Sequence, residues 1–116
     1  MPEEAVSSRL TLEIDRAGRA ATVRCGGKLV AGVTDFLYVR VVQLIPDTKR
    51  IVLDLTDLTH MDSMGLGTVV RLYVSARAAG CDLELINLGE RIRQLLGVTN
   101  LLSVFGICGE HGIRLP

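Results

Sequence analysis

The sequence contains little of what nucleic-acid binding requires. It has no Trp, only two Tyr and two Phe, and its 13 Lys and Arg balance 13 Asp and Glu, so the formal net charge is zero. Proteins that bind DNA or RNA normally carry an excess of basic charge, and single-strand binders stack bases on aromatic rings. We therefore expect no direct nucleic-acid partner.

Long apolar runs are also missing. Charged residues interrupt every apolar stretch before it reaches the roughly 18 residues of a membrane-spanning helix. The first ten residues, MPEEAVSSRL, carry acids where a secretory signal has basic residues, and no apolar run follows them. These features predict a cytoplasmic protein without a membrane span.

Cysteine is scarce and scattered. The three cysteines are Cys25, Cys81 and Cys108, with no C-x-x-C pair among them and only two His in the chain. An odd number at these spacings disfavours both a disulfide framework and a structural zinc site. Buried thiols are the expected state.

The 116 residues fit one domain, and at 48% apolar they can form a core without metal or disulfides. The patterned part of the chain predicts a domain over residues 9–106. Residues 1–8 and 107–116 lack periodicity and are expected to be tails.

Strand and helix periodicity alternate along this domain. The predicted strands cover residues 10–15, 21–25, 51–55 and 83–87, with residues 103–105 as a further candidate. The first two form a hairpin, and the uniformly apolar third is expected to be covered on both faces. The predicted helices cover residues 33–44, ended by Pro46, residues 63–79, ended by Gly80, and residues 90–96, ended by Gly97.

This order, β-β-α-β-α-β-α, predicts an α/β fold. Strands that are joined through helices run parallel and are connected by right-handed crossovers. We expect a mixed sheet with a parallel core, opened by an antiparallel N-terminal hairpin and covered by helices.

The unusual segment is LTDLTHMDSMGLG, which follows the most apolar strand and opens the clearest helix. Asp62 or Ser63 lies where the helix N-cap should be. Gly65 and Gly67 follow in the first turns, although each costs up to about 1 kcal/mol against Ala in a helix. Bare backbone would allow another molecule to approach the helix start. A serine hydroxyl there suits covalent phosphate, which the N-terminal N–H groups favour. The alternative is that the Asp-Ser pair is only a cap.

Two kinds of active site are alternatives to a phosphorylated serine at this position. Ser63 is not part of a G-x-S-x-G elbow, and although His60 is near in sequence, nothing orients it as a general base. Asp54, Asp57 and Asp62 could form a magnesium site, but such acids are more often caps and turn formers. We expect no catalysis, no cofactor and no metal.

The segment DLTHMDSMGLG resembles the signature of the STAS domain, the fold of bacterial anti-sigma factor antagonists. In that family a strand ending in Asp-Leu leads to Asp-Ser-Ser/Thr-Gly-Leu, which opens a helix. Gly27-Lys28-Leu29, the strand over residues 51–55 and Gly80 are supporting matches, and the resemblance covers about residues 9–106.

The resemblance implies a phosphorylation switch. It makes Ser63 the residue that is phosphorylated by a partner acting as both serine kinase and anti-sigma factor. Without phosphate such a protein binds the anti-sigma factor and frees the sigma factor; with phosphate it is released, and a phosphoserine phosphatase restores it. This chain departs from the family pattern at Met64, in place of a second Ser/Thr, and at Val30, in place of an acid.

The predicted partner surface surrounds Ser63. It comprises Lys28, Leu29, His60, Met61, Asp62, Met64, Gly65, Leu66, Gly67 and Arg71. The remaining alternatives keep the fold and change the role: a STAS subunit of a lipid-transport ABC complex, or a scaffold in stress signalling, neither of which needs the phosphoswitch.

Overall fold

The computed structural model describes residues 3–98, 106–108 and 112–114. Its strands are β1 (Glu3–Val6), β2 (Leu10–Ala17), β3 (Ala20–Leu29), β4 (Arg50–Met61), β5 (Asp82–Ile86), β6 (Gly106–Cys108) and β7 (Gly112–Arg114). Its helices are α1 (Thr34–Val42), the short 3-10 helix η1 (Ile45–Asp47), α2 (Ser63–Ala78) and α3 (Glu90–Val98).

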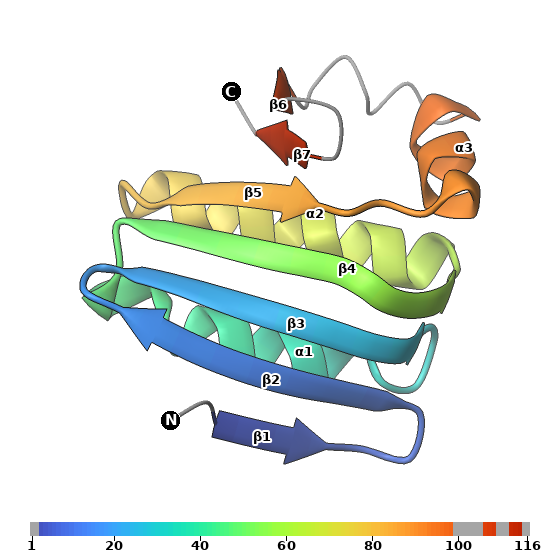
Figure 1. The fold of residues 1–116 in the computed structure, drawn as a ribbon, viewed down its shortest axis with the longest axis horizontal. Helices are drawn as coiled ribbons and strands as arrows, with labels where there is room; N and C mark the ends of the chain where they lie inside the picture. The colour runs from blue at the N-terminus through green and yellow to red at the C-terminus, as the bar shows by residue number, and fades with distance from the viewer. Residues whose placement is uncertain (1–2, 99–105, 109–111, 115–116) are drawn as a thin grey trace.

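The described strands form one mixed sheet in the order β1-β2-β3-β4-β5-β7-β6 (Figure 1). Strands β3, β4 and β5 are parallel neighbours, whereas β1, β2 and β3 are paired antiparallel. The predicted parallel core and N-terminal hairpin are therefore confirmed. The short strand β7 adds to β5 antiparallel and pairs with β6.

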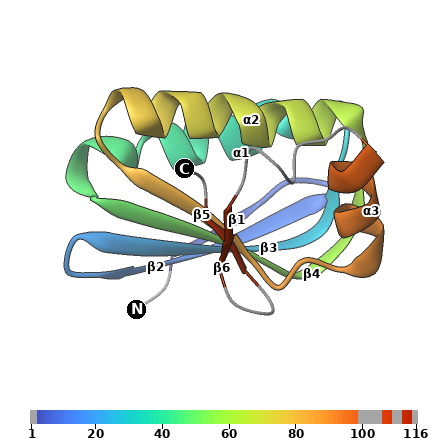
Figure 2. The same ribbon diagram turned by 90° about the horizontal axis from the view of Figure 1, so that it is seen from above.

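Helices α1 and α2 lie side by side on one face of the sheet (Figure 2). Successive right-handed crossovers that advance in one direction across a sheet place their helices on the same side. Helix α3 lies at the end of the sheet where β4 ends (Figures 1 and 2). None of the described helices has the length and hydrophobicity needed to cross a membrane.

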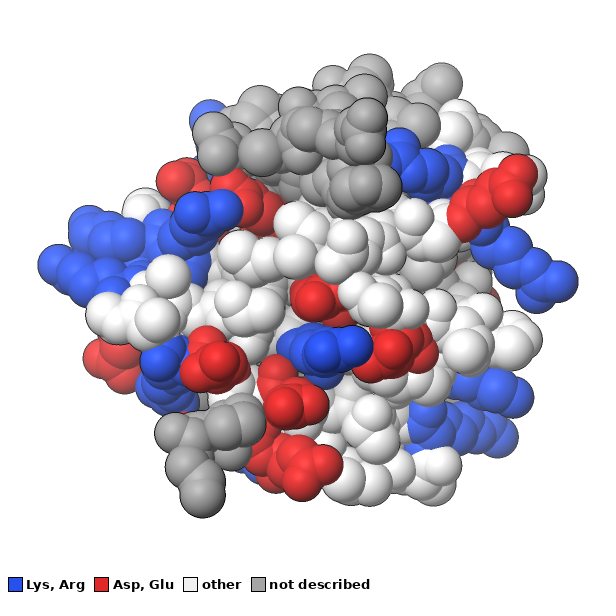
Figure 3. Space-filling model, viewed as in Figure 1, with Lys and Arg blue, Asp and Glu red and all other residues white. Residues whose placement is uncertain are grey.

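Among the residues that the structure describes, no helix covers the opposite face of the sheet. The expected burial of residues 51–55 on both faces is confirmed in part: Ile51, Leu53 and Leu55 are buried in the core, and Val52, which alternates to the other face, is only 9% exposed. Figure 3 shows acidic and basic side chains interspersed over this open face. On it, Arg24 Nε donates to Asp57 Oδ2 at 2.8 Å, which raises the pKa of Arg24. Asp54 accepts from the Thr56 backbone N–H and from Asn87 Nδ2.

The core lies between the sheet and the α1–α2 layer. Alternate residues of β2, β3 and β4 point into it, among them Leu12, Val23 and Leu53, all at 0% exposure. Helix α2 faces the core with Leu66, Val69, Leu72 and Ala76, which are buried, whereas Tyr73 is only partly buried.

Both expected tails contribute strands, which corrects the sequence interpretation. Strand β1 pairs with β2 from Glu3↔Ile14 to Val6↔Thr11, and β6 and β7 extend the other edge. Segments of three or four residues are too short to display a period, and pairing with an existing strand supplies their order. The candidate strand over residues 103–105 lies outside the described residues.

Strand β4 continues through residues 56–61, beyond residue 55 where the predicted strand ends. The lengthened β3 pairs with this extension as far as Leu29↔Met61, with register shifts that accommodate the irregular segment. Gly80 ends α2 in the left-handed region as predicted, with φ +73°. Helix α3, in contrast, continues through Gly97 to Val98.

Cys25 and Cys81 are buried and form no disulfide, as expected. Burial raises the pKa of the Cys25 thiol to about 12. Cys108 lies in β6.

Candidate functional site

Asp62, and not Ser63, is the N-cap of α2. Its Oδ1 accepts from the Gly65 backbone N–H at 2.9 Å, which satisfies one unpaired donor of the first turn. Its Oδ2 accepts from the Ala31 backbone N–H, also at 2.9 Å. One carboxylate therefore joins the start of α2 to the loop between β3 and α1. These hydrogen bonds, that of Ala31 foremost, lower the pKa of Asp62.

The two glycines after Asp62 have different surroundings. Gly65 is buried, and a Cβ at this position would overlap the backbone carbonyl oxygen of Leu29. Gly67 is exposed, and a Cβ there would meet nothing within 4 Å. Gly65 is thus required by the close packing of α2 on β3, which corrects our expectation that both glycines leave room for a partner.

Ser63 is the first residue of α2 and is exposed. It borders a depression of about 480 Å³ between the two helices. The depression is lined by Thr34, Asp35, Ser63, Met64, Gly67, Thr68 and Arg71. Met64 is 58% exposed and adds an apolar side chain to the lining of the depression.

Arg71 is held against α1 by an aromatic ring. Its guanidinium carbon lies 4.2 Å from the ring centroid of Tyr38, within the range of a cation–π contact. The Tyr38 hydroxyl is in turn 3.0 Å from Ser75 Oγ on α2. The ring is therefore fixed between the helices and positions the arginine beside the depression.

Lys28 and His60 are paired across β3 and β4, and both are exposed. Thr59 Oγ1 donates to the Gly27 carbonyl oxygen at 3.0 Å and lies 2.9 Å from His60 Nδ1. Because the single proton of the Thr59 hydroxyl is donated to Gly27, the hydroxyl oxygen can only accept a hydrogen bond from His60. The proton of a neutral His60 is accordingly on Nδ1, and Nε2 is an open acceptor.

The predicted partner residues differ in burial. Exposed are Lys28, His60, Met64, Gly67 and Arg71, and half-buried are Met61 and Asp62. Leu29, Gly65 and Leu66 are buried, at 0% exposure for Leu29 and 5% for Leu66. These three residues are enclosed by the fold and support the site from inside, whereas the exposed residues of the set form its surface.

Sequence reasoning missed Thr34 and Asp35 of α1 and the ring of Tyr38. They lie about 30 positions from Ser63 along the chain and belong to a different helix. No local pattern links them to the Asp-Ser segment, because only the packing of α1 on α2 brings them to the depression. The backbone N–H of Ala31 was missed for the same reason.

The three acids weighed as a magnesium site have separate partners. Asp57 pairs with Arg24, Asp54 with Thr56 and Asn87, and Asp62 with backbone N–H groups. Among the described residues, no group of three or more His, Cys, Asp or Glu side chains could hold a metal ion.

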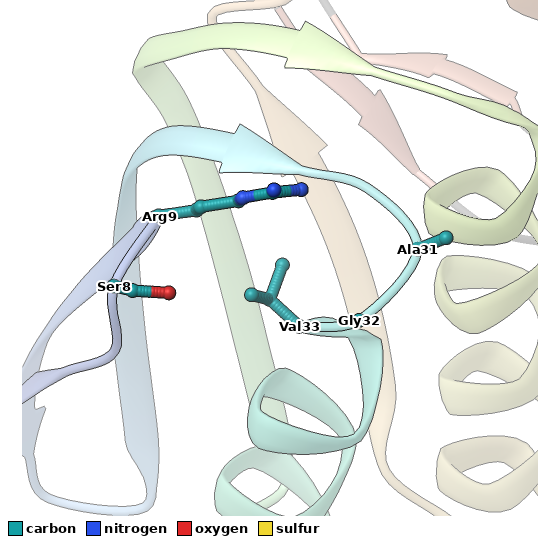
Figure 4. Close-up of a pocket in the computed structure, with 5 residues that line it drawn as sticks. All are labelled: Ser8, Arg9, Ala31, Gly32 and Val33. Atoms are coloured by element: carbon teal, nitrogen blue, oxygen red, sulfur yellow. The ribbon is translucent and has the colours of Figure 1, made fainter.

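A smaller depression, of about 260 Å³, lies beside the loop that Asp62 holds. It is lined by Ser8, Arg9, Ala31, Gly32 and Val33 (Figure 4). Arg9, from the β1–β2 connection, extends alongside the β3–α1 loop, and Ala31 points toward α2 (Figure 4). Ser63 lines the larger depression and not this one.

Replacing Asp62 by Ala should destabilise the fold by about 1–2 kcal/mol at neutral pH, because it removes the cap and leaves the Ala31 N–H without its acceptor. The folded-state pKa of Asp62 is lowered, so its contribution is present above the ordinary pKa near 3.8 and is lost as the pH falls through the folded value. Urea unfolding at several pH values measures this. The difference in the free energy of unfolding between wild type and Asp62→Ala should become smaller at acidic pH. Asp62→Asn, which keeps an amide oxygen as acceptor, should show a smaller loss at neutral pH.

The fold and the site together define a small α/β domain whose distinctive surface surrounds the start of one helix. The profile of the STAS domain family matches residues 11–112. The chain belongs to the STAS domain family, as the resemblance of the Asp-Ser segment predicted.

Individual relatives are similar over part of their length. The chain is 35% identical over 60 residues to the anti-sigma-B factor antagonist of Listeria monocytogenes. The matched region covers 52% of this chain and 53% of that protein. It is 36% identical over 62 residues to the anti-sigma-B factor antagonist of Bacillus subtilis, which covers 52% and 57%. The chain thus matches little more than half the length of these curated relatives.

A solved structure with a similar fold is the anti-sigma factor antagonist of Mycobacterium paratuberculosis. The TM-score is 0.75 at 17% identity, with 87% of this chain and 86% of that chain covered. At this identity the likeness concerns the fold alone.

Proposed function

We propose that this chain is a bacterial anti-sigma factor antagonist that acts in the cytoplasm through protein binding and not through catalysis. Without phosphate on Ser63 it binds an anti-sigma factor that is also a serine kinase. Phosphorylation of Ser63 releases it, and a phosphoserine phosphatase returns it to the binding state. Transcription that depends on the sigma factor is regulated as a result.

The observation that carries this proposal is the position of the Ser63 hydroxyl. It is exposed on the first residue of α2, next to the Asp62 cap and beside a depression with the exposed Met64. A kinase can reach such a hydroxyl, and a docked protein would cover it. The two relatives named as anti-sigma-B factor antagonists support the same role.

The modification would change the charge of this surface strongly. The kinase transfers the γ-phosphoryl group of ATP to Ser63 Oγ: the new O–P bond forms, the bond to ADP breaks and the hydroxyl proton is lost. The product carries about −1.5 to −2 charges at pH 7. Two unit charges about 5 Å apart at an effective dielectric near 20 repel by roughly 3 kcal/mol. Carboxylates of a partner that faced Ser63 would be repelled on this scale.

The test is capture followed by reconstitution. Tagged wild-type chain is incubated with lysate of the source bacterium, and both the bait and its partners are examined by mass spectrometry. We expect an ATP-binding serine kinase to be captured and, after purification and addition of ATP, to place phosphate on Ser63. Ser63→Ala should remain unphosphorylated, whereas Ser8→Ala, a change at another exposed serine, should react like wild type.

The alternatives predict different results. A membrane ABC-type ATPase as the captured partner, with no phosphate on the bait, would contradict the proposal in favour of a lipid-transport subunit. Phosphate on a residue other than Ser63 would contradict the site assignment.

A further inference from the structure

The depression between α1 and α2 brings a free cationic group to the same hollow as Ser63. Asp35 of α1 and Arg71 of α2 both line it, with Gly67 and Thr68 between Ser63 and Arg71 along α2. Gly67 has no side chain to fill the space. The hollow of about 480 Å³ is large enough for a phosphoryl group with part of its hydration.

Arg71 is suited to hold an anion there. In the part of the chain that the structure describes, its guanidinium contacts the Tyr38 ring and forms no ion pair. A stacked guanidinium keeps its N–H groups at the edge of the plane, where they can still donate to phosphate oxygens. Arg71 is therefore positioned by Tyr38 without being neutralised.

The distance along the helix is compatible with such an interaction. Arg71 lies eight residues after Ser63, which is about 12 Å of helix rise. Helical side chains tilt toward the N-terminus, so the Arg71 side chain leans back over the preceding turn, and the phosphoryl group on Ser63 has to reach it through the hollow that both residues line. Phosphorylation extends the serine side chain and adds three acceptor oxygens at its end.

The charged neighbours of this hollow differ in sign. Asp35 is exposed on its α1 side, and Asp62 precedes Ser63 with both oxygens engaged by backbone N–H groups. On the β3 and β4 side, Lys28 and His60 are exposed. Helix α2 itself contains no acid, and its other arginine, Arg77, lies in the last turn. Arg71 is thus the cation of α2 that lies on the same hollow as Ser63.

We propose that the phosphoryl group on Ser63 is received in the α1–α2 depression, with Arg71 as its counter-ion and Asp35 as an opposing charge. The inference rests on the proposed phosphorylation of Ser63 and adds how release is achieved. A phosphoryl group drawn toward Arg71 fills the hollow that a partner side chain would occupy, so phosphorylation closes the docking surface sterically as well as by repulsion.

The test uses the chain with phosphoserine inserted at position 63 during translation, so that no kinase is required. Phosphorus NMR over a pH series measures the second ionisation of the phosphate. An adjacent cation favours the dianion, so Arg71→Gln should raise the phosphate pKa by roughly half a unit or more. Arg71→Lys should restore most of the difference, and Asp35→Asn should lower the pKa.

Arg77→Gln is the matched control, because it removes the same charge from the far end of α2. If Arg71→Gln shifts the phosphate pKa no more than Arg77→Gln does, the proposed counter-ion is wrong. Circular dichroism of each variant establishes that the helices are intact. If Arg71→Gln shifts the phosphate pKa but no serine kinase is captured, the proposed function is contradicted and the phosphate site is supported. If a kinase is captured but Arg71→Gln does not shift the phosphate pKa, only the phosphate site is contradicted.

Discussion

Phosphoserine at position 63 should weaken binding of the captured anti-sigma factor by a hundredfold or more, which corresponds to roughly 2.7 kcal/mol. Ser63→Asp should weaken it at least tenfold, because it adds one negative charge beside the Asp62 carboxylate. Ser63→Ala should bind like wild type and should fail to be released by ATP. Calorimetric titration of each variant with the purified partner measures these constants.

The salt dependence of binding separates the electrostatic part of this loss of affinity from the steric part. Repulsion between exposed charges is screened as ionic strength rises, so the Ser63→Asp defect should shrink between 50 mM and 500 mM salt. The part of the phosphoserine defect that comes from filling the hollow should persist. Ser8→Asp adds the same charge at another exposed serine and should bind normally. Binding of Ser63→Asp and phosphoserine chains at wild-type affinity would contradict the switch.

Gly65→Ala should destabilise the fold by about 2–3 kcal/mol, in the upper range for overpacked positions. The added Cβ would overlap the Leu29 carbonyl oxygen, which belongs to the backbone of β3 and cannot rotate away. Relief requires α2 to move off the sheet, which also strains the hydrogen bond from Gly65 N–H to Asp62. Urea unfolding followed by circular dichroism measures the free-energy difference.

Gly67→Ala is the matched control, two residues further along the same helix. A Cβ at this position meets nothing, and Ala is favoured over Gly in a helix by up to about 1 kcal/mol, so this variant should be neutral or stabilised. If Gly65→Ala and Gly67→Ala lowered the free energy of unfolding equally, contact with Leu29 would not be the reason for the glycine at position 65. In the partner-binding assay, Gly67→Leu should reduce affinity without loss of stability, because it fills the hollow.

Some features of the fold were predictable because their causes are local. The alternation of Leu10, Leu12 and Ile14 with polar residues indicates a half-buried strand, and β2 has that burial pattern. Asp62 could be recognised as a cap from its place before an apolar helical period, and Gly80 as the stop of α2. In each case the signal and the structure involve the same few residues.

Other features depend on pairing between distant segments, which local patterns do not record. Strand β4 continues through His60 because β3 extends beside it, and β1 is ordered by β2. Leu29 follows the exposed Lys28 and Leu66 precedes the exposed Gly67, yet both leucines are buried in the core. These expectations failed for the same physical reason. Strand pairing and burial depend on the segment that packs against a residue, and that segment is far away in the chain.

The amino-acid sequence by itself determined the α/β order of elements, the family and the serine at the start of α2. The tertiary structure alone decided that Gly65 packs against Leu29, that Asp62 also holds the β3–α1 loop, and that Asp35 and Arg71 line one hollow with Ser63. Periodicity and capping arise from neighbours within a few residues, so a single chain displays them. The charge and shape of the proposed docking surface arise from two helices and the ends of β3 and β4, and they exist only once those elements have packed.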